Sequence, residues 1–247
     1  MKTTGNTIFV TGGTSGLGLG LALRWHDLGN KVIIGGRRKD LLDRIAAEHR
    51  GIDTVVLDVD DPASISAAYD EVTTRYPDLD AVLTMAGIMR PENLLDPEHL
   101  ATAEATITTN LLGTIRTLTY FAPYLATKEN ATILTVSSGL AFVPLTLTPT
   151  YNATKAAIHS YTQSLRIQLA GTGVQVIELV PPAVRTALMG QQDDERAMPL
   201  EEYLSETMSI LTAQPEVTEV TVRRVGFLRD AEREGRYQQT VDALNSH

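Results

Sequence analysis

Apolar positions fall into two patterns that alternate along the first 180 residues of the chain. Short runs rich in Val, Ile and Thr are typical of buried β-strands. Between them lie longer stretches in which apolar residues recur at helical spacing. Strands that alternate with helices predict parallel pairing through βαβ crossovers, with helices on both faces of the sheet. The predicted strands are residues 7–11, 31–35, 53–57, 79–84, 131–137 and 174–180.

Several predicted helices carry end signals. Gly29 and Gly171 are expected to end two of them, because glycine readily takes the left-handed conformation that closes a helix. Asp60 or Asp61 precedes a proline and is expected to cap a third helix. The pattern over 97–125 predicts two helices in succession. The predicted helical stretches are residues 17–29, 40–49, 62–75, 97–125 and 151–169.

The last quarter of the chain is less regular. Residues 187–215 are richer in polar side chains and are expected to form a loop with short helices, acting as a substrate lid over the sheet edge. Residues 215–234 are expected to be helical, within a helical tail over 216–247. Since no linker or repeat divides the chain, residues 1–247 are expected to form a single doubly wound α/β domain. Its parallel sheet should have six strands, or seven if the C-terminal end adds one.

Composition and charge exclude several function classes. The 247 residues include 30 acidic and 21 basic ones, and the resulting charge of −9 argues against nucleic-acid binding and against an anionic membrane surface. The absence of cysteine excludes disulfides and thiolate chemistry, and the five histidines lack metal-ligand spacing, so no metal is expected. The uncharged stretch 131–154 is interrupted by prolines and hydroxyl residues. No membrane segment is therefore predicted, and a cytoplasmic protein is expected.

A glycine-rich turn follows the first predicted strand and opens the first predicted helix. A helix N-terminus presents free N–H groups and the positive end of its dipole, and glycines let the backbone approach a pyrophosphate. The alternative is a tight turn that binds nothing. The strand–turn–helix context favours a nucleotide site, with contacts expected from Gly12, Thr14, Ser15, Gly16, Leu17 and Gly18.

Four further polar residues are candidates for the chemistry of the site. Tyr151 and Lys155 lie four apart and so share one helix face. A nearby ammonium lowers the pKa of a tyrosine, which is otherwise about 10. Ser138 ends the fifth predicted strand, at the sheet edge where open α/β folds bind ligands. Asn110 lies in the preceding helical stretch. Each residue alone has a structural explanation, but their combination with the glycine turn is hard to attribute to chance.

The glycine spacing, Ser138 placed 13 residues before Tyr151, the Lys155 pairing and Asn110 together resemble the short-chain dehydrogenase/reductase family, over roughly residues 5–186. The resemblance implies a Rossmann-type fold and hydride transfer at the nicotinamide C4 of a bound cofactor. It implies that Tyr151 donates a proton to a carbonyl oxygen that Ser138 polarises. It also implies that Lys155 lowers the pKa of Tyr151 and holds the nicotinamide ribose, while Asn110 completes a proton relay.

The residues after the second predicted strand bear on the choice of cofactor. A carboxylate there would bond the ribose 2′-OH of NAD, whereas arginine suits the 2′-phosphate of NADP. The acidic position holds Gly36, and Arg37 and Arg38 follow it. NADP(H) is therefore the preferred prediction, with NAD(H) as the alternative. By the same resemblance, the other cofactor contacts are expected from Asp58, Val59, Ala86, Gly87, Tyr151, Lys155, Pro181, Val184 and Thr186.

Two segments depart from the family's usual pattern. Thr84 and Met85 stand where the family has two asparagines, so any hydrogen bonds of those amides must come from other groups. Pro182 replaces a glycine, and because proline fixes φ and lacks an N–H, a stiffer loop is predicted beside the nicotinamide. These departures keep a second class open: a cofactor-binding protein without turnover, such as a redox sensor or an assembly subunit.

The expected substrate is a small, partly apolar carbonyl compound or alcohol, because the candidate pocket side chains are apolar: Leu140, Phe142, Val143, Leu145, Leu188 and Met189. A homodimer or homotetramer is also expected, since family members usually associate through the helices that carry Asn110 and Tyr151. The apolar residues available for this are Leu111, Ile115, Leu118, Phe121, Ile158, Leu165 and Leu169, which could equally belong to the core.

Overall fold

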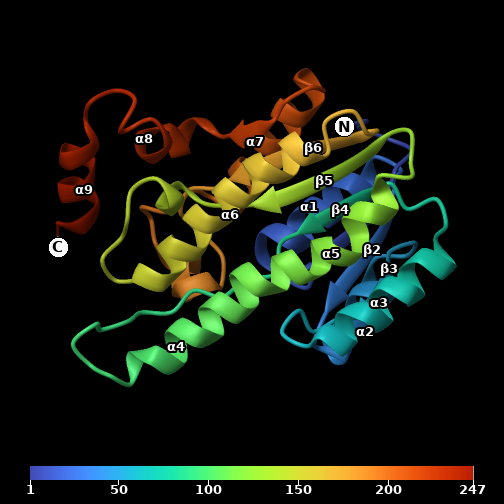
Figure 1. Ribbon diagram of the computed structural model, residues 1–247, viewed down its shortest axis with the longest axis horizontal. Helices are drawn as coiled ribbons and strands as arrows, with labels where there is room; N and C mark the ends of the chain where they lie inside the picture. Colours follow the sequence, from blue (N-terminus) through green and yellow to red (C-terminus); the bar gives the residue numbers. More distant parts are fainter. Residues whose placement is uncertain (247) are drawn as a thin grey trace.

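Seven parallel strands form the centre of the computed structural model, which describes residues 1–246 (Figure 1). Their order is β3-β2-β1-β4-β5-β6-β7, so the winding direction reverses between β1 and β4. Such a reversal opens a crevice at the carboxyl ends of the strands, where doubly wound folds bind ligands. The strands are β1 (Thr7–Thr11), β2 (Lys31–Gly36), β3 (Asp53–Val56), β4 (Ala81–Thr84), β5 (Ala131–Val136), β6 (Val174–Val180) and β7 (Glu219–Thr221).

Helices cover both faces of this sheet (Figure 1). Successive strand residues point to opposite faces, so Ile8 and Val10 enter one core while Phe9 enters the other. One core packs against α1 (Gly16–Asp27), α2 (Lys39–Glu48) and α7 (Leu200–Ala213). The other packs against α3 (Pro62–Arg75), α5 (Gly113–Leu125) and α6 (Pro149–Gln168). The doubly wound architecture predicted from the sequence is thus confirmed.

The predicted end signals act as expected. Gly29 and Gly171 follow α1 and α6 with φ of +84° and +90°. Asp61 is the N-cap of α3, and its carboxylate accepts a hydrogen bond from the Ala63 N–H at 2.9 Å. Capping of this kind satisfies a backbone donor that the helix itself leaves free.

The helical stretch before β5 is continuous. It runs through α4 (His99–Thr106), the π-helical segment η1 (Ile107–Leu112) and α5, and Figure 1 shows α4 and α5 in one line. The two predicted helices are therefore joined through a π turn. Such turns are rare and are frequent at functional sites. Asn110 lies inside this one.

The chain after residue 186 differs most from prediction. A loop with short helices was expected up to residue 215, but beyond the 3-10 segment η3 (Leu188–Asp193) it contains the 14-residue helix α7. The prediction of a helix over residues 215–234 is wrong. That segment instead forms β7, the 3-10 turn η4 (Arg223–Val225) and α8 (Gly226–Arg229), and α9 (Tyr237–Asn245) follows. β7 supplies the seventh strand, but three residues are too few for a recognisable strand pattern.

Several apolar residues considered for subunit contacts belong to the core of the single chain. Leu118, Phe121 and Ile158 are each 1% exposed. Burial excludes these three from an interface, so association through the helices that carry Asn110 and Tyr151 stays a prediction that rests on the less buried positions. Within residues 1–246, no helix is long and apolar enough to span a membrane.

Candidate active site

A cavity of about 560 Å³ opens at the carboxyl ends of the strands. It extends from the first turn of α1 and the end of β2 to α6 and the C-terminal segments. Of the predicted site residues, Asn110 and Asp58 are not on its wall. Those on the wall are Gly12, Thr14, Ser15, Gly16, Leu17, Gly18, Arg37, Arg38, Val59, Ala86, Gly87, Ser138, Tyr151, Lys155, Pro181, Val184 and Thr186.

The glycine turn is held against two neighbouring strands. The Gly12 N–H donates to the Gly35 carbonyl at 2.9 Å, and Gly12 has φ +68°. A Cβ on Gly12 would lie 2.6 Å from the Ala86 Cα, and one on Gly18 would lie 2.6 Å from the Gly12 carbonyl oxygen. The spacing of these glycines is therefore required by backbone contact.

The N-terminus of α1 has unpaired donors. Its N-cap residue, Ser15, is extended and makes no side-chain capping hydrogen bond. The first amides of a helix lack partners within the helix, and the dipole adds positive potential there. Because Ser15, Gly16 and Leu17 line the cavity, this helix end can hold an anionic group such as a phosphate.

Two cations stand at the end of β2. A Cβ on Gly36 would meet the Thr14 Cγ2 at 2.5 Å, so a larger residue at this position would require the Thr14 side chain to shift. Arg37 and Arg38 follow and face the cavity. The Arg37 guanidinium is 58% exposed and lies 3.6 Å from the Asp60 carboxylate. This leaves guanidinium donors free for a ligand.

The segments after β3 and β4 place small or apolar groups on the wall. Val59 lines the cavity, whereas the Asp58 carboxylate accepts a hydrogen bond from the Asp60 N–H at 3.1 Å. Thr84 donates through its hydroxyl to the Leu134 carbonyl at 3.3 Å, and the Met85 N–H donates to the Thr11 hydroxyl at 3.2 Å. These contacts tie the end of β4 to its two neighbouring strands in place of asparagine amides.

Ser138 comes directly after β5. Its hydroxyl accepts a hydrogen bond from the Leu140 N–H at 3.1 Å, which caps a short 3-10 turn, and the residue is only 6% exposed. Since a hydroxyl also donates, Ser138 keeps one O–H for a group in the cavity.

Tyr151 and Lys155 project from the first turns of α6 into the same cavity. The Lys155 ammonium lies 5.5 Å from the centre of the Tyr151 ring and donates to the Val136 carbonyl at 2.8 Å. Both residues are buried, at 8% and 7% exposure. Sequence spacing and structure agree that the two side chains share one face of the helix.

Burial dominates the titration of this pair. It raises the pKa of Tyr151 to about 12, with the Ser138 hydroxyl acting in the opposite direction. It lowers the pKa of Lys155 to about 8, with Glu178 opposing. The resemblance implied a Tyr151 pKa lowered by Lys155; here desolvation of the phenolate raises the pKa of Tyr151 instead.

Asn110 braces the site from the π-helical segment. Its side-chain oxygen accepts from the Ile88 N–H at 2.7 Å, and its side-chain nitrogen donates to the Ile88 carbonyl at 2.8 Å. The same nitrogen lies 3.3 Å from the Thr154 hydroxyl, next to Lys155 in the chain. Asn110 thereby connects the loop after β4 with α6.

The loop after β6 closes over the glycine turn. Val184 pairs with Met198 in a short bridge, and the Arg185 N–H donates to the Met198 carbonyl at 2.8 Å. A Cβ on Gly16 would lie 3.5 Å from Thr186, so this loop covers the first turn of α1. The Pro181 carbonyl accepts from the Gly139 N–H at 3.0 Å and fixes the start of the loop.

The remaining wall is apolar. Of the predicted pocket residues, Leu140, Leu145 and Leu188 line the cavity. Phe142, Val143 and Met189 do not: Val143 is fully buried, and Phe142 packs its ring against His159 at 4.7 Å. The structure also brings Leu228 of α8 and Leu244 of α9 onto the wall from the tail, and no sequence pattern predicted either residue there.

No group of His, Asp or Glu side chains with the geometry of a metal site occurs in the part of the chain that the structure describes.

Comparison with known proteins places this site in a family. The family model for the short chain dehydrogenase matches residues 6–197. The chain belongs to the short-chain dehydrogenase family. The match covers the glycine turn, Asn110, Ser138, Tyr151 and Lys155, and so the whole of the candidate site apart from the tail.

A relative that matches along almost its whole length is named an oxidoreductase. The "Uncharacterized oxidoreductase DltE" of Bacillus subtilis (strain 168) is 37% identical over 252 residues, covering 100% of this chain and 99% of that protein. This short-chain dehydrogenase is thus an oxidoreductase of the family.

Solved structures agree on the fold. A short chain dehydrogenase from Burkholderia cenocepacia J2315 in complex with NADP superposes with a TM-score of 0.83 at 23% identity, covering 100% of both chains. The 3-ketoacyl-(acyl-carrier-protein) reductase from Brucella melitensis, complexed with NADH, gives a TM-score of 0.79 at 26% identity, covering 91% of this chain and 100% of that one. Both kinds of nicotinamide cofactor therefore occur among the structural neighbours of this short-chain dehydrogenase.

Proposed function

We propose that this short-chain dehydrogenase is an NADP(H)-dependent oxidoreductase that interconverts a small, partly apolar carbonyl compound and its alcohol, with Tyr151 as the general acid and base. One observation carries the proposal. A single cavity is lined by the N-terminus of α1, by Arg37 and Arg38, and by the buried side chains of Ser138, Tyr151 and Lys155.

The chain's residues fit a dinucleotide. Gly12 and Gly18 allow close backbone packing in the turn. No side chain caps the N-terminus of α1, so its amides can bind a pyrophosphate. Arg37 and Arg38 offer guanidinium donors for a 2′-phosphate, and Gly36 supplies no carboxylate that would favour NAD. Lys155, Val184 and Thr186 would hold the nicotinamide end. The cofactor supplies the hydride; the protein supplies orientation and protons.

The proton chemistry follows from burial. A Tyr151 hydroxyl with a pKa of about 12 stays protonated at neutral pH and is available as a donor to a carbonyl oxygen. Ser138 would donate a second hydrogen bond to the same oxygen. Lys155, with a pKa of about 8, is mainly an ammonium below that pH and would stabilise the phenolate that remains. Reduction should therefore slow as the pH rises through about 8.

The substrate end favours an apolar group beside the carbonyl. Leu140, Leu145, Leu188, Leu228 and Leu244 line it, and the charged residues of the cavity wall are Arg37, Arg38 and Lys155. Because an uncompensated carboxylate or phosphate is costly to desolvate, an uncharged aldehyde or ketone fits this end best.

The test combines binding with turnover. Calorimetry at fixed salt should show NADPH bound at least about tenfold more tightly than NADH, as a charge-assisted bidentate contact provides. NADPH oxidation should then be followed with a panel of aliphatic and aromatic aldehydes and ketones. Equal affinity for the two cofactors would contradict the NADP preference, and tight binding without turnover of any carbonyl would favour the cofactor-binding protein without catalysis.

A further inference from the structure

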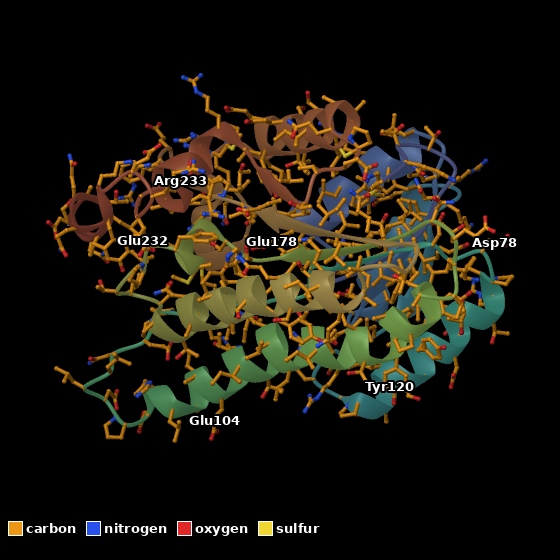
Figure 2. The ribbon with its side chains drawn as sticks, turned by 45° about the horizontal axis from the view of Figure 1, so that its top comes forward. Asp78, Glu104, Tyr120, Glu178, Glu232 and Arg233 are labelled. Carbon is orange, nitrogen blue, oxygen red and sulfur yellow. The ribbon has the colours of Figure 1, made fainter. Side chains whose placement is uncertain are left out.

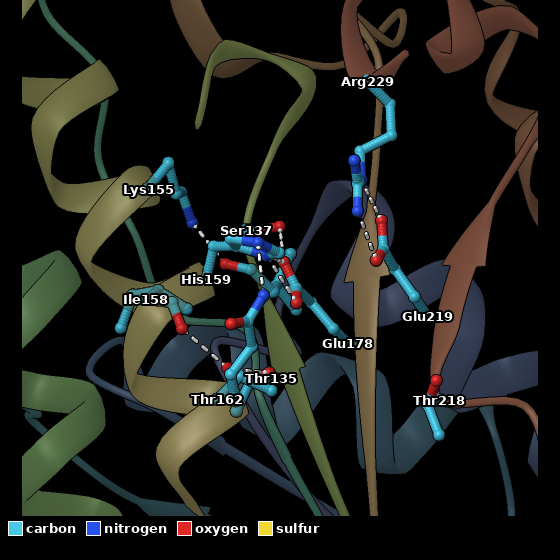
Figure 3. Close-up of polar contacts among 12 residues, drawn as sticks. Thr135, Ser137, Lys155, Ile158, His159, Thr162, Glu178, Thr218, Glu219 and Arg229 are labelled. Carbon is cyan, nitrogen blue, oxygen red and sulfur yellow. Dashed lines mark hydrogen bonds and ion pairs between the residues drawn. The ribbon is translucent and has the colours of Figure 1, made fainter. Parts of the chain in front are cut away.

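A polar cluster lies behind the candidate active site, between the sheet and α6 (Figure 3). Thr135, Ser137 and Glu178 share one face of the sheet, and α6 turns Lys155, His159 and Thr162 towards them at spacings of four and three. The Thr135 and Thr162 hydroxyls are 2.7 Å apart. Figure 2 shows Glu178 in the interior of the molecule, whereas Asp78, Glu104 and Tyr120 lie at its periphery.

Glu178 is the buried carboxylate of this cluster, with its side chain 1% exposed. It accepts a hydrogen bond from the Ser137 hydroxyl. Both its oxygens lie 2.9 Å from Nδ1 of His159, and Nε2 of that ring lies 2.8 Å from the Gln163 amide nitrogen. Glu178 is thus held by the Ser137 hydroxyl on the sheet side and by the His159 ring on the α6 side.

The charged groups around Glu178 come from α6, β7 and α8. β7 places Glu219 directly opposite it, and Arg229 of α8 binds both oxygens of that second carboxylate. The neighbouring strand β5 contributes only the hydroxyl groups named above. The titratable and charged groups around it are Lys155 and His159 of α6, Glu219 of β7 and Arg229 of α8. Arg166 of α6 instead donates to the Val176 and Thr218 carbonyls.

One of the cations near Glu178 already has a carboxylate partner. Arg229 is matched by Glu219. Lys155 donates to the Val136 carbonyl, one residue before the serine that Glu178 holds. Burial lowers the pKa of Lys155, and Glu178 is the group that raises it. A buried ammonium without a counter-charge gives up its proton, so the carboxylate of Glu178 opposes that loss.

We propose that Glu178 is a positioning residue of the active site. Through Ser137 it holds the end of β5 that carries Ser138, and through His159 it places a negative charge one turn of α6 from the Lys155 ammonium. His159 is its hydrogen-bond partner, which fixes the carboxylate between the sheet and α6. The inference rests on the proposed roles of Tyr151 and Lys155.

The decisive measurement is the titration of Lys155 in the full-length protein. The sequence has five lysines, so NMR of protein labelled with [ε-¹³C]lysine gives few signals, and a Lys155→Arg variant assigns the one needed. Glu178→Gln keeps the side-chain size and an oxygen acceptor but removes the charge. Its Lys155 midpoint should fall by about one pH unit below that of the wild-type protein.

Glu219→Gln is the matched control, since it makes the same change on the same sheet face in the next strand. Its carboxylate is held by Arg229, so the Lys155 midpoint should move by no more than a few tenths of a unit. Glu178→Asp retains the charge and should return the Lys155 midpoint most of the way to its wild-type value. This rescue also serves if Glu178→Gln does not fold, because the shortened carboxylate should then still give a small downward shift.

An unchanged Lys155 midpoint in Glu178→Gln, or an equal shift in Glu219→Gln, overturns the inference. The titration requires no turnover, so its result is separate from the proposed function. If Tyr151→Phe retained turnover while the Lys155 midpoint shifted in Glu178→Gln, the proposed function would fail and the effect of Glu178 on the charge of Lys155 would stand. With a carbonyl substrate in hand, the alkaline limb of kcat should move by the same amount as the midpoint.

Discussion

The two ends of the cavity are built in different ways. At the cofactor end, Gly12, Gly16 and Gly18 act through the backbone, within a few residues of the end of one strand. At the substrate end, the wall is made by side chains from segments far apart in sequence, including Leu140 after β5 and Leu244 in α9. One end thus depends on local chain geometry, and the other depends on how distant segments pack.

This difference separates what the two ends can recognise. Backbone amides at a helix terminus suit a phosphate whatever the surrounding side chains. An apolar wall selects by shape, and adding or removing one methylene there changes binding by only about 1–3 kcal/mol. Substitutions at the cofactor end should therefore affect all substrates equally, whereas those at the substrate end should affect them unequally.

The largest effect is expected where the two ends meet, at Tyr151. Tyr151→Phe removes the proton donor but little volume, so kcat should fall about 1,000-fold, or ~4 kcal/mol in the activation free energy. Steady-state kinetics and cofactor calorimetry check this. The cofactor dissociation constant should change less than about threefold. A variant that retained a tenth of the wild-type kcat would exclude Tyr151 as the general acid.

Next in size is a backbone clash at the cofactor end. Gly12→Ala places a Cβ 2.6 Å from the Ala86 Cα at a positive φ, so thermal or urea unfolding should show a loss of about 3 kcal/mol. Cofactor affinity should fall as well, because the turn must move.

Gly235→Ala is the control for backbone strain alone. Its φ is +69°, and a Cβ there meets nothing within 4 Å. It should cost about 1 kcal/mol and leave cofactor binding intact. Equal losses of unfolding free energy in Gly12→Ala and Gly235→Ala would show that the close backbone approach at Gly12 is not the reason a glycine is needed there.

A smaller, selective effect is expected at Arg37. Arg37→Ala should weaken NADPH binding about 20-fold, or ~2 kcal/mol, while NADH binding changes little, because only the 2′-phosphate loses a charge-assisted partner. Arg44→Ala removes an exposed arginine from the same helical region without touching the cavity, and it should bind both cofactors as the wild type does. A parallel loss for NADPH and NADH in Arg37→Ala would assign the arginine to another part of the cofactor.

The same contrast explains how far the sequence could be interpreted. The glycine turn lies between β1 and α1, and Ser138 and the Tyr151–Lys155 pair lie between β5 and α6; each spacing is local to one strand–helix unit, so pattern and structure agree on the placement of these residues. β7 was missed because its three residues form a strand only by pairing with β6. Glu178 was not singled out, although a glutamate in the buried run 174–180 was a signal that something on α6 must meet it.

The smallest effect tests whether the tail belongs to the substrate end. The Asn245 side chain accepts from the Thr146 N–H at 2.7 Å and donates to the Pro144 carbonyl at 3.1 Å, which fastens α9 to the loop that carries Leu145. Asn245→Ala should loosen Leu244 and raise KM about fivefold, or ~1 kcal/mol, most for the bulkiest apolar carbonyl compound. Gln238→Ala on the exposed side of α9 should leave KM unchanged, since that side chain bonds Asp242 on its own helix. An effect of Asn245→Ala on NADPH affinity rather than on KM would mean that the tail serves the cofactor end, and the division of the cavity into two ends would have to be redrawn.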